Sequence, residues 1–175
     1  MAWTTPRTFV DGELENAAIF NTHLRDNLNA LPAHTLARKT ADESVTSSTT
    51  LQDDDHLFFT MGTNQIWMLE LVLWLVDGGT GKYKFFATGP ASSTWGFQAV
   101  QFSVAGTLTS RVFDSVNGQT DTQCTPSAGQ VQSWHGYATT GATAGNLQFQ
   151  WAQSTSSGSA TVIKRGSYLA GYQVA

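Results

Sequence analysis

The chain has 175 residues, and its hydrophobic share of 41%, with six tryptophans and ten phenylalanines, is enough for one compact domain with a substantial core. A formal net charge of −4 excludes a general electrostatic attraction to nucleic acid or to an anionic membrane. The single cysteine, Cys124, excludes an intrachain disulfide and a thiolate metal cage.

An extended arm opens the chain. Residues 1–12 hold two large apolar anchors, Trp3 and Phe9, and Pro6 disfavours a helix between them. No apolar run of the kind found in signal peptides occurs here, so we expect synthesis in a reduced cytoplasm. Asp11 and Gly12 then predict a turn and a helix N-cap.

A helix is predicted over residues 13–31, ending before Pro32. Its residues at heptad spacing form a seam: Leu14, Ala17, Asn21, Leu24, Leu28 and Leu31. A buried amide such as Asn21 commonly fixes the register of a coiled coil. The spacing fits equally well with self-association and with an amphipathic helix packed on its own domain, because three heptads are short for a coiled coil.

A linker over 32–44 and a β domain over 45–175 are predicted next, since the apolar period changes from 3.5 to 2 after residue 45. Strands are expected at 45–51, 56–61, 66–76, 83–88, 95–104, 108–113, 131–138, 147–153 and 162–174, the last broken near Gly166. Short antiparallel strands at this spacing predict a mainly β fold, a jelly-roll-like sandwich preceded by the arm and one helix.

The segment 66–76 is apolar on both faces. It is too short to span a bilayer, and Glu70 interrupts it. A two-layer sandwich normally leaves one face of each sheet in water. Because one face of this strand serves the core, we expect the other to be covered by a neighbouring subunit through Met68, Glu70, Val72 and Trp74.

Catalytic and metal-binding patterns are weak. Three carboxylates and an imidazole at 53–56 can bind a divalent cation, but in an extended chain Asp54 points away from Asp53 and Asp55, and a solvated turn explains them better. Residues 78–82 lack the spacing of a phosphate loop and read as a hairpin. No nucleophile elbow occurs, so we expect no catalytic residue, no metal, no cofactor and no enzyme activity.

Aromatic side chains on a surface rich in Ser, Thr and Gln can stack on sugar rings. The candidates for such a ligand site are Trp95, Trp134 and Tyr137, and each of them fits the core equally well.

Two stretches resemble bacteriophage virion proteins. Residues 8–31, TFVDGELENAAIFNTHLRDNLNAL, are similar to an N-terminal module of siphophage tail- and head-associated proteins. The matching positions are Gly12, Glu13, Ala17, Ala18, Asn21, Leu24, Arg25, Asp26, Asn27 and Leu31. Residues 38–59 resemble the segment that leads into a β domain in minor structural proteins of actinobacteriophage type.

The resemblance implies an accessory structural protein of the virion, assembled in the host cytoplasm as a homotrimer. Its jelly-roll heads would project as capsid decoration (a head fibre) or as a tail-associated protein. The arm and helix, through Trp3, Phe9 and the seam, would attach it to the major capsid or tail protein. The alternative is a tail-fibre module that recognises a host surface glycan. Neither reading needs nucleic acid or a membrane as partner.

Overall fold

The computed structural model describes residues 4–5, 7–12, 14, 16–29, 31, 33–77, 82–102, 108–114, 121–122 and 130–174. The chain divides into an N-terminal unit, Met1–Ala33, and a β unit, His34–Ala175. Strands make up 52% of the structure, and the predicted mainly β sandwich preceded by one helix is confirmed. Trp3, Cys124 and the hairpin predicted at 78–81 lie outside the described residues.

The helix of the N-terminal unit is shorter than predicted. It runs through α1 (Ala17–Phe20), the π-helical turn η1 (Asn21–Arg25) and α2 (Asp26–Asn29). It begins four residues late because Asn16, in an extended conformation, is the N-cap and accepts a hydrogen bond from the Ile19 amide. The predicted register residue Asn21 lies in the π turn, so the α-helical heptad spacing is interrupted there.

The arm folds back along this helix. The buried Asn27 accepts from the Thr4 amide at 2.9 Å and donates to the Thr4 carbonyl at 2.9 Å, as a paired strand residue would. The side chain thus ties the extended arm to the helix, while Arg7 lies 5.3 Å from the Phe9 ring centroid.

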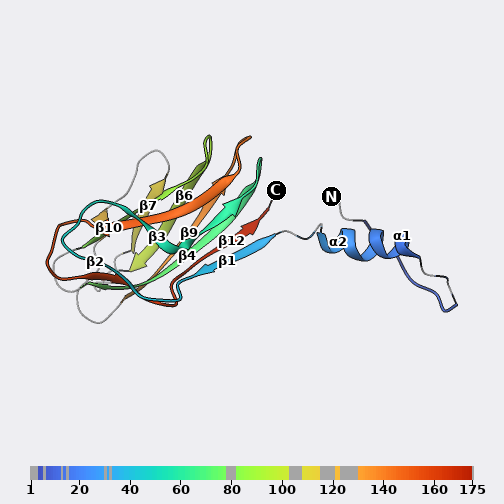
Figure 1. Cartoon of the computed structure of the whole chain (residues 1–175), viewed down its shortest axis with the longest axis horizontal. Helices are drawn as coiled ribbons and strands as arrows, with labels where there is room; N and C mark the ends of the chain where they lie inside the picture. Colours follow the sequence, from blue (N-terminus) through green and yellow to red (C-terminus); the bar gives the residue numbers. More distant parts are fainter. Residues whose placement is uncertain are drawn as a thin grey trace. The chain divides into compact units, whose positions relative to one another are not determined.

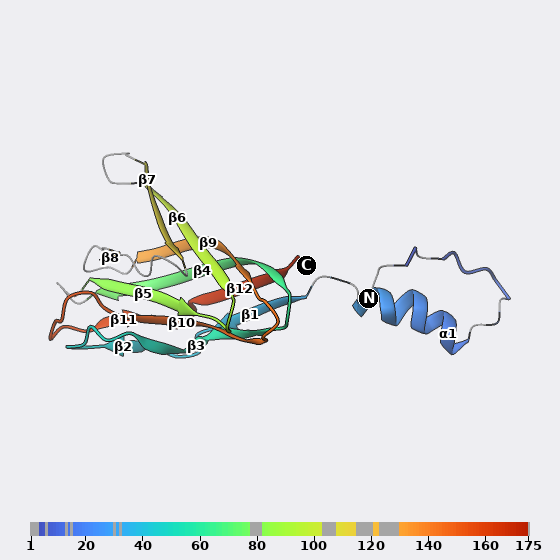
Figure 2. The ribbon, with the colours of Figure 1, turned by 90° about the horizontal axis from the view of Figure 1, so that it is seen from above.

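The β unit is a two-layer antiparallel sandwich (Figures 1 and 2). Its strands are β1 (His34–Arg38), β2 (Glu43–Val45), β3 (Gln52–Met61), β4 (Ile66–Asp77), β5 (Tyr83–Thr88), β6 (Thr94–Phe102), β7 (Leu108–Asp114), β8 (Asp121–Thr122), β9 (Gln130–Thr139), β10 (Gly145–Gln153), β11 (Thr161–Ile163) and β12 (Tyr168–Gln173).

The strand order is that of a jelly roll. One layer, the large sheet, runs β1-β12-β4-β9-β6-β7, with β2 and β11 at its margin; the other, the small sheet, runs β3-β10-β5-β8. Successive strands β1, β3, β4, β5, β8, β9, β10 and β12 build two four-stranded layers, β1-β12-β4-β9 and β3-β10-β5-β8. The hairpin of β6 and β7 is an addition that extends the large sheet beyond β9 (Figure 2).

Two predicted boundaries are wrong. The expected linker at 32–44 instead contains β1, which pairs with β12, and β2, which pairs with β11. The strand predicted at 45–51 ends at Val45, because Ser47 adopts a positive φ of 54° and its amide bonds the Ser157 carbonyl. The break predicted near Gly166 is confirmed: β11 and β12 are separated by a turn in which Gly166 has φ 96°.

The core lies between the two sheets. On β4, Trp67, Leu69, Leu71, Leu73 and Leu75 are all buried, as their alternation predicts. Aromatic rings from both layers meet them: Phe59 lies 5.1 Å from Trp67, and Phe85 meets Trp134 edge-on at 4.8 Å. Burial on this scale contributes about 1.5–3 kcal/mol per large apolar side chain.

Candidate functional site

The strand register of the large sheet brings a second set of apolar side chains together on the face turned away from the core, here called the outer face. Met68 on β4 lies opposite Tyr172 of β12 and Tyr137 of β9. Glu70 lies opposite Ala170 and His135, and Leu36 of the edge strand β1 pairs with Ala170. The outer face thus runs across β1, β12, β4 and β9.

Large apolar side chains are exposed across this face. Ile66, Met68 and Trp74 on β4 keep 43%, 53% and 46% of their surface exposed. The face continues on the neighbouring strands through four more exposed side chains, Leu36, Val131, Tyr137 and Tyr172. Val72 and Glu70 are half-buried. The structure therefore brings together the four residues predicted as a subunit interface and adds neighbours on β1, β9 and β12 that alternation within β4 does not reveal.

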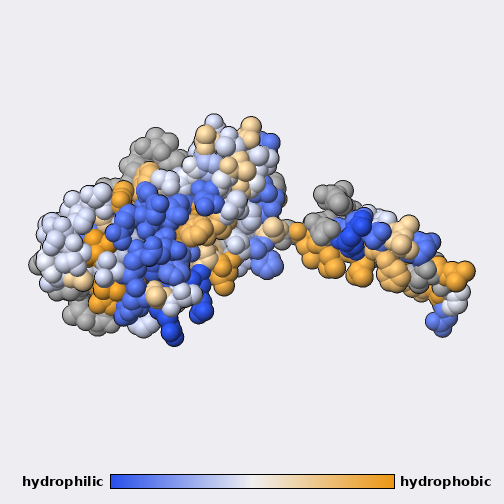
Figure 3. All heavy atoms as spheres, viewed as in Figure 1, coloured by the Kyte–Doolittle hydropathy of each residue, from blue (hydrophilic) through white to orange (hydrophobic). Residues whose placement is uncertain are grey.

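The small sheet has a different outer face. Gln148 and Gln150 of β10, Asp53 of β3 and the hydrogen-bonded Thr60 and Asn146 point outward there, with Phe58 as its exposed large apolar side chain. Hydrophilic side chains cover the middle of the side on which β3 and β10 lie (Figure 3). Within one chain, therefore, one outer face is polar and the other apolar, so composition alone does not explain the apolar one.

A hollow of about 580 Å³ opens on the outer face of the large sheet. Met68 of β4, His135 and Tyr137 of β9 and Gln98 of β6 surround it. Its floor is backbone: Gly96 lies opposite Tyr137, and a Cβ at Gly136 would come within 2.3 Å of the Gly96 carbonyl oxygen. Gly96 shares the outward parity of Tyr137 and thus leaves the hollow open where a larger residue would fill it, whereas Gly136 shares the inward parity of Leu69 and Phe97.

Glu70 stands in the middle of this apolar surface. Its Oε1 accepts a hydrogen bond from the Tyr168 hydroxyl at 3.2 Å, and His135 lies across from it in the register. Burial and the neighbouring carboxylate together raise the pKa of the Tyr168 hydroxyl. On β1, β12, β4 and β9, Glu70 is the only carboxylate of the outer face and Arg38 the only guanidinium.

Two of the three predicted ligand-binding aromatics are wrong. Trp134 is fully buried and Trp95 is 3% exposed, and both point into the core because they share the inward parity of their strands. Trp95 packs edge-on against Phe86 at 5.0 Å. Tyr137, which has the opposite parity, is 48% exposed and borders the hollow.

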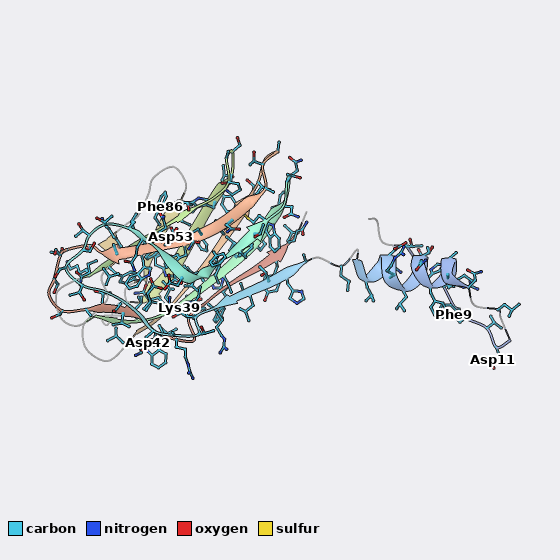
Figure 4. All side chains as sticks on the ribbon, viewed as in Figure 1. Phe9, Asp11, Lys39, Asp42, Asp53 and Phe86 are labelled. Atoms are coloured by element: carbon cyan, nitrogen blue, oxygen red, sulfur yellow. The ribbon has the colours of Figure 1, made fainter. Side chains whose placement is uncertain are left out.

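The acidic segment 53–56 is not the solvated turn that the sequence suggested. It lies within β3, and Asp54 is buried beside the fully buried ammonium of Lys39. Figure 4 labels Lys39 and Asp53 in the β unit. Lys39 Nζ contacts Asp54 Oδ2 at 2.6 Å and Glu43 Oε2 at 2.5 Å. Asp54 Oδ1 accepts from the amides of His56 and Leu57, both at 2.9 Å. The register of β3 against β10 shifts between Asp53 and Phe58, which reverses the alternation of the strand and turns Asp54 inward.

This cluster also contains the best-placed metal ligands of the described residues, since Glu43, Asp54 and His56 offer atoms within 4.8 Å of one another. The Lys39 ammonium already lies between both carboxylates, and a divalent cation in the same space would meet it as a like charge. His56 Nε2 is engaged with the Thr40 hydroxyl at 2.9 Å. The chemistry of this set favours an internal ion pair that ties β1 to β3.

Charge, burial and hydrogen bonding act together on the carboxyl groups of this cluster. Burial raises the pKa of Asp54 against the opposing effect of Lys39. For Glu43 burial acts in the same direction, but the Lys39 ammonium, aided by the Asp55 amide and Gln52, outweighs it and lowers the pKa of that carboxyl.

The N-terminal unit has its own apolar surface. The predicted seam is turned to solvent: Leu14 is 91% exposed, and Leu24, Leu28 and Leu31 are more than half exposed. These apolar side chains gather along one side of the unit (Figure 3). We call this surface the leucine stripe.

Comparison with models of protein families, with curated proteins and with solved structures finds no match to the chain. Among the residues described, no helix is long and apolar enough to cross a membrane.

Proposed function

We propose that this chain is a structural protein of a bacteriophage particle that works as a homotrimer. Its jelly-roll heads are displayed on the particle as capsid decoration or as a tail-associated protein, and its N-terminal unit attaches them. The proposal combines the resemblance of residues 8–31 and 38–59 to virion proteins with two apolar surfaces that the single chain leaves open.

The apolar outer face of the large sheet is the observation that carries self-association. Seven large apolar side chains on four adjacent strands are between 43% and 65% exposed. A contiguous patch of that kind marks a contact surface on a soluble protein. Covering each side chain contributes on the order of 1 kcal/mol, about half of the value for complete burial, which is enough in sum to hold copies together.

The leucine stripe supports attachment. A short helix with exposed leucines and a tethered arm gains stability only when a partner covers the stripe. That partner is the leucine stripe of another copy, held close by the β units, or an apolar groove of a capsid or tail protein.

Self-association is tested by two matched variants. We expect Met68→Gln with Trp74→Gln to convert the wild-type oligomer into monomers of 18.9 kDa, because both side chains leave the apolar face. Phe58→Gln removes the exposed apolar side chain of the other sheet and should leave the oligomer intact. The mass of each variant in solution shows whether it is an oligomer or a monomer. A monomeric wild-type protein would contradict the proposal.

Attachment is tested on particles. We expect a chain without residues 1–31 to fold and oligomerise but to be missing from purified particles, because the arm and the leucine stripe are gone. Mass spectrometry of particles from an infection that supplies the truncated protein measures its incorporation. Normal incorporation of the truncated chain would show that attachment lies elsewhere.

A second candidate function rests on Tyr137. This ring is 48% exposed beside a hollow that also presents Gln98 and His135, an arrangement suited to a sugar ring of a host glycan. Binding of the wild-type oligomer to host-cell glycans, lost in Tyr137→Ala while the mass stays unchanged, would favour this receptor-binding function.

A further inference from the structure

We infer that copies of the chain contact each other through two parts of the outer face. The edge formed by β1 and β12 in one copy, here called the β1–β12 margin, packs into the hollow on β4, β9 and β6 of the next copy. This inference rests on the proposed self-association and specifies its contact. Two features of the outer face carry it, one of shape and one of charge.

The β1–β12 margin presents exposed apolar side chains. Leu36 lies on the edge strand, with 63% of its surface exposed, and Tyr172 beside it is 53% exposed. In the described part of the chain β1 pairs with β12 alone, so no strand covers the other side of β1 next to Leu36. An edge strand with an exposed leucine is a surface that natural proteins normally cover.

The hollow recedes. It lies across the same sheet from the margin, where Gly96 of β6 adds no side chain beside Tyr137 of β9. Its walls are mostly apolar, so it suits an aliphatic or aromatic side chain better than a charged one. Exposed apolar side chains at the margin and a mostly apolar hollow elsewhere on the same face are complementary surfaces.

The margin and the hollow also carry opposite charges. Arg38 lies two residues from Leu36 on the margin and makes no hydrogen bond or ion pair with the described residues. Glu70 stands beside the hollow with only the Tyr168 hydroxyl as a described partner. When the margin of one copy covers the hollow of another, Arg38 approaches Glu70 and each charge gains the partner that it lacks within its own chain. In the proposed trimer, three such head-to-tail contacts would close a ring.

Charge exchange tests the contact. We expect Arg38→Glu alone and Glu70→Arg alone each to raise the dissociation constant of the oligomer at least about tenfold, since each sets like charges together. The double variant, Arg38→Glu with Glu70→Arg, should recover wild-type assembly to within a few fold. Lys84→Glu, a charge reversal on the small sheet, is the matched control and should leave the mass distribution unchanged.

Cross-linking provides a measurement that does not depend on charge. In a Cys124→Ser background, Leu36→Cys with Tyr137→Cys should form disulfide-linked chains on oxidation. Within one chain these positions are separated by β12 and β4, so at least about 14 Å lies between them, too far for an intrachain disulfide. Each single-cysteine variant should stay free of the link.

The outcomes separate this contact from self-association itself. A wild-type oligomer that tolerates both single charge reversals, or that the double variant fails to restore, overturns the margin-to-hollow contact and leaves the proposed oligomer standing. Absence of linked chains from the double-cysteine oligomer overturns it as well. A monomeric wild-type protein removes both proposals.

Discussion

Replacing Lys39 with methionine is expected to destabilise the β unit by about 3–5 kcal/mol at pH 7, the loss typical of a buried charge left without its partner. Lys39 is fully buried and contacts both Asp54 and Glu43. Methionine fills a similar volume but cannot neutralise the two carboxylates. Urea denaturation at one fixed protein concentration measures the loss.

The stability of the same variant should also depend differently on pH. In the wild-type protein the pKa of Glu43 is lowered, so its contribution is present above the ordinary carboxyl range and is lost as the pH falls through the folded value. The pKa of Asp54 is already raised by burial, and without Lys39 burial and the Glu43 carboxylate raise it further against the His56 amide, so the folded variant takes up a proton more readily than the unfolded chain. The difference in stability between the two proteins should therefore shrink as the pH falls from 7 towards 4.

Lys164→Met is the matched control for this prediction. Lys164 also pairs with an aspartate, Asp42, but both side chains are partly exposed, at 32% and 45%. A surface ion pair of this kind contributes little, so the denaturation midpoint should change far less than in Lys39→Met. Equal losses in the two variants would mean that burial of Lys39 does not govern its contribution.

The sequence predicts the architecture well because the apolar period is strong in the longest strands. On β4 the alternating leucines enter the core and Met68 and Trp74 do not, as period 2 requires. The helix is less well predicted at its start, since Asn16 is the N-cap instead of the predicted Asp11-Gly12. The jelly-roll order follows from pairing between distant strands such as β1 and β12, which no local pattern specifies.

Three features escape the sequence for physical reasons. Alternation shows that Trp134 and Tyr137 face opposite sides of β9, but it does not show which side is the core. Lys39 and Asp54 are fifteen residues apart and meet only when the end of β1 packs against β3. In the sequence, their charges therefore resemble those of a solvated linker and turn. The hollow depends on Gly96 lying opposite Tyr137 on the neighbouring strand, which the strand register determines.

Substitution by alanine should therefore lower the free energy of unfolding much more at Trp134 than at Tyr137. Trp134 is fully buried against Phe85 at 4.8 Å, so Trp134→Ala leaves a large cavity and is expected to cost about 3–5 kcal/mol of unfolding free energy. Tyr137→Ala removes a half-exposed ring and should cost less than about 1 kcal/mol. Denaturation of both variants, at one protein concentration, measures the contrast.

Assembly should show the reverse order. Tyr137 borders the hollow that we assign to a second copy, so Tyr137→Ala is expected to weaken the oligomer by at least about tenfold while the fold is retained, which sedimentation across a dilution series measures. Trp134→Ala acts only through the fold, because no surface of this ring reaches the outer face. A Tyr137→Ala protein that unfolds like Trp134→Ala, or that assembles as tightly as the wild type, would place the contact away from β9. Two side chains three residues apart on one strand thus separate what holds the sandwich together from what joins its copies.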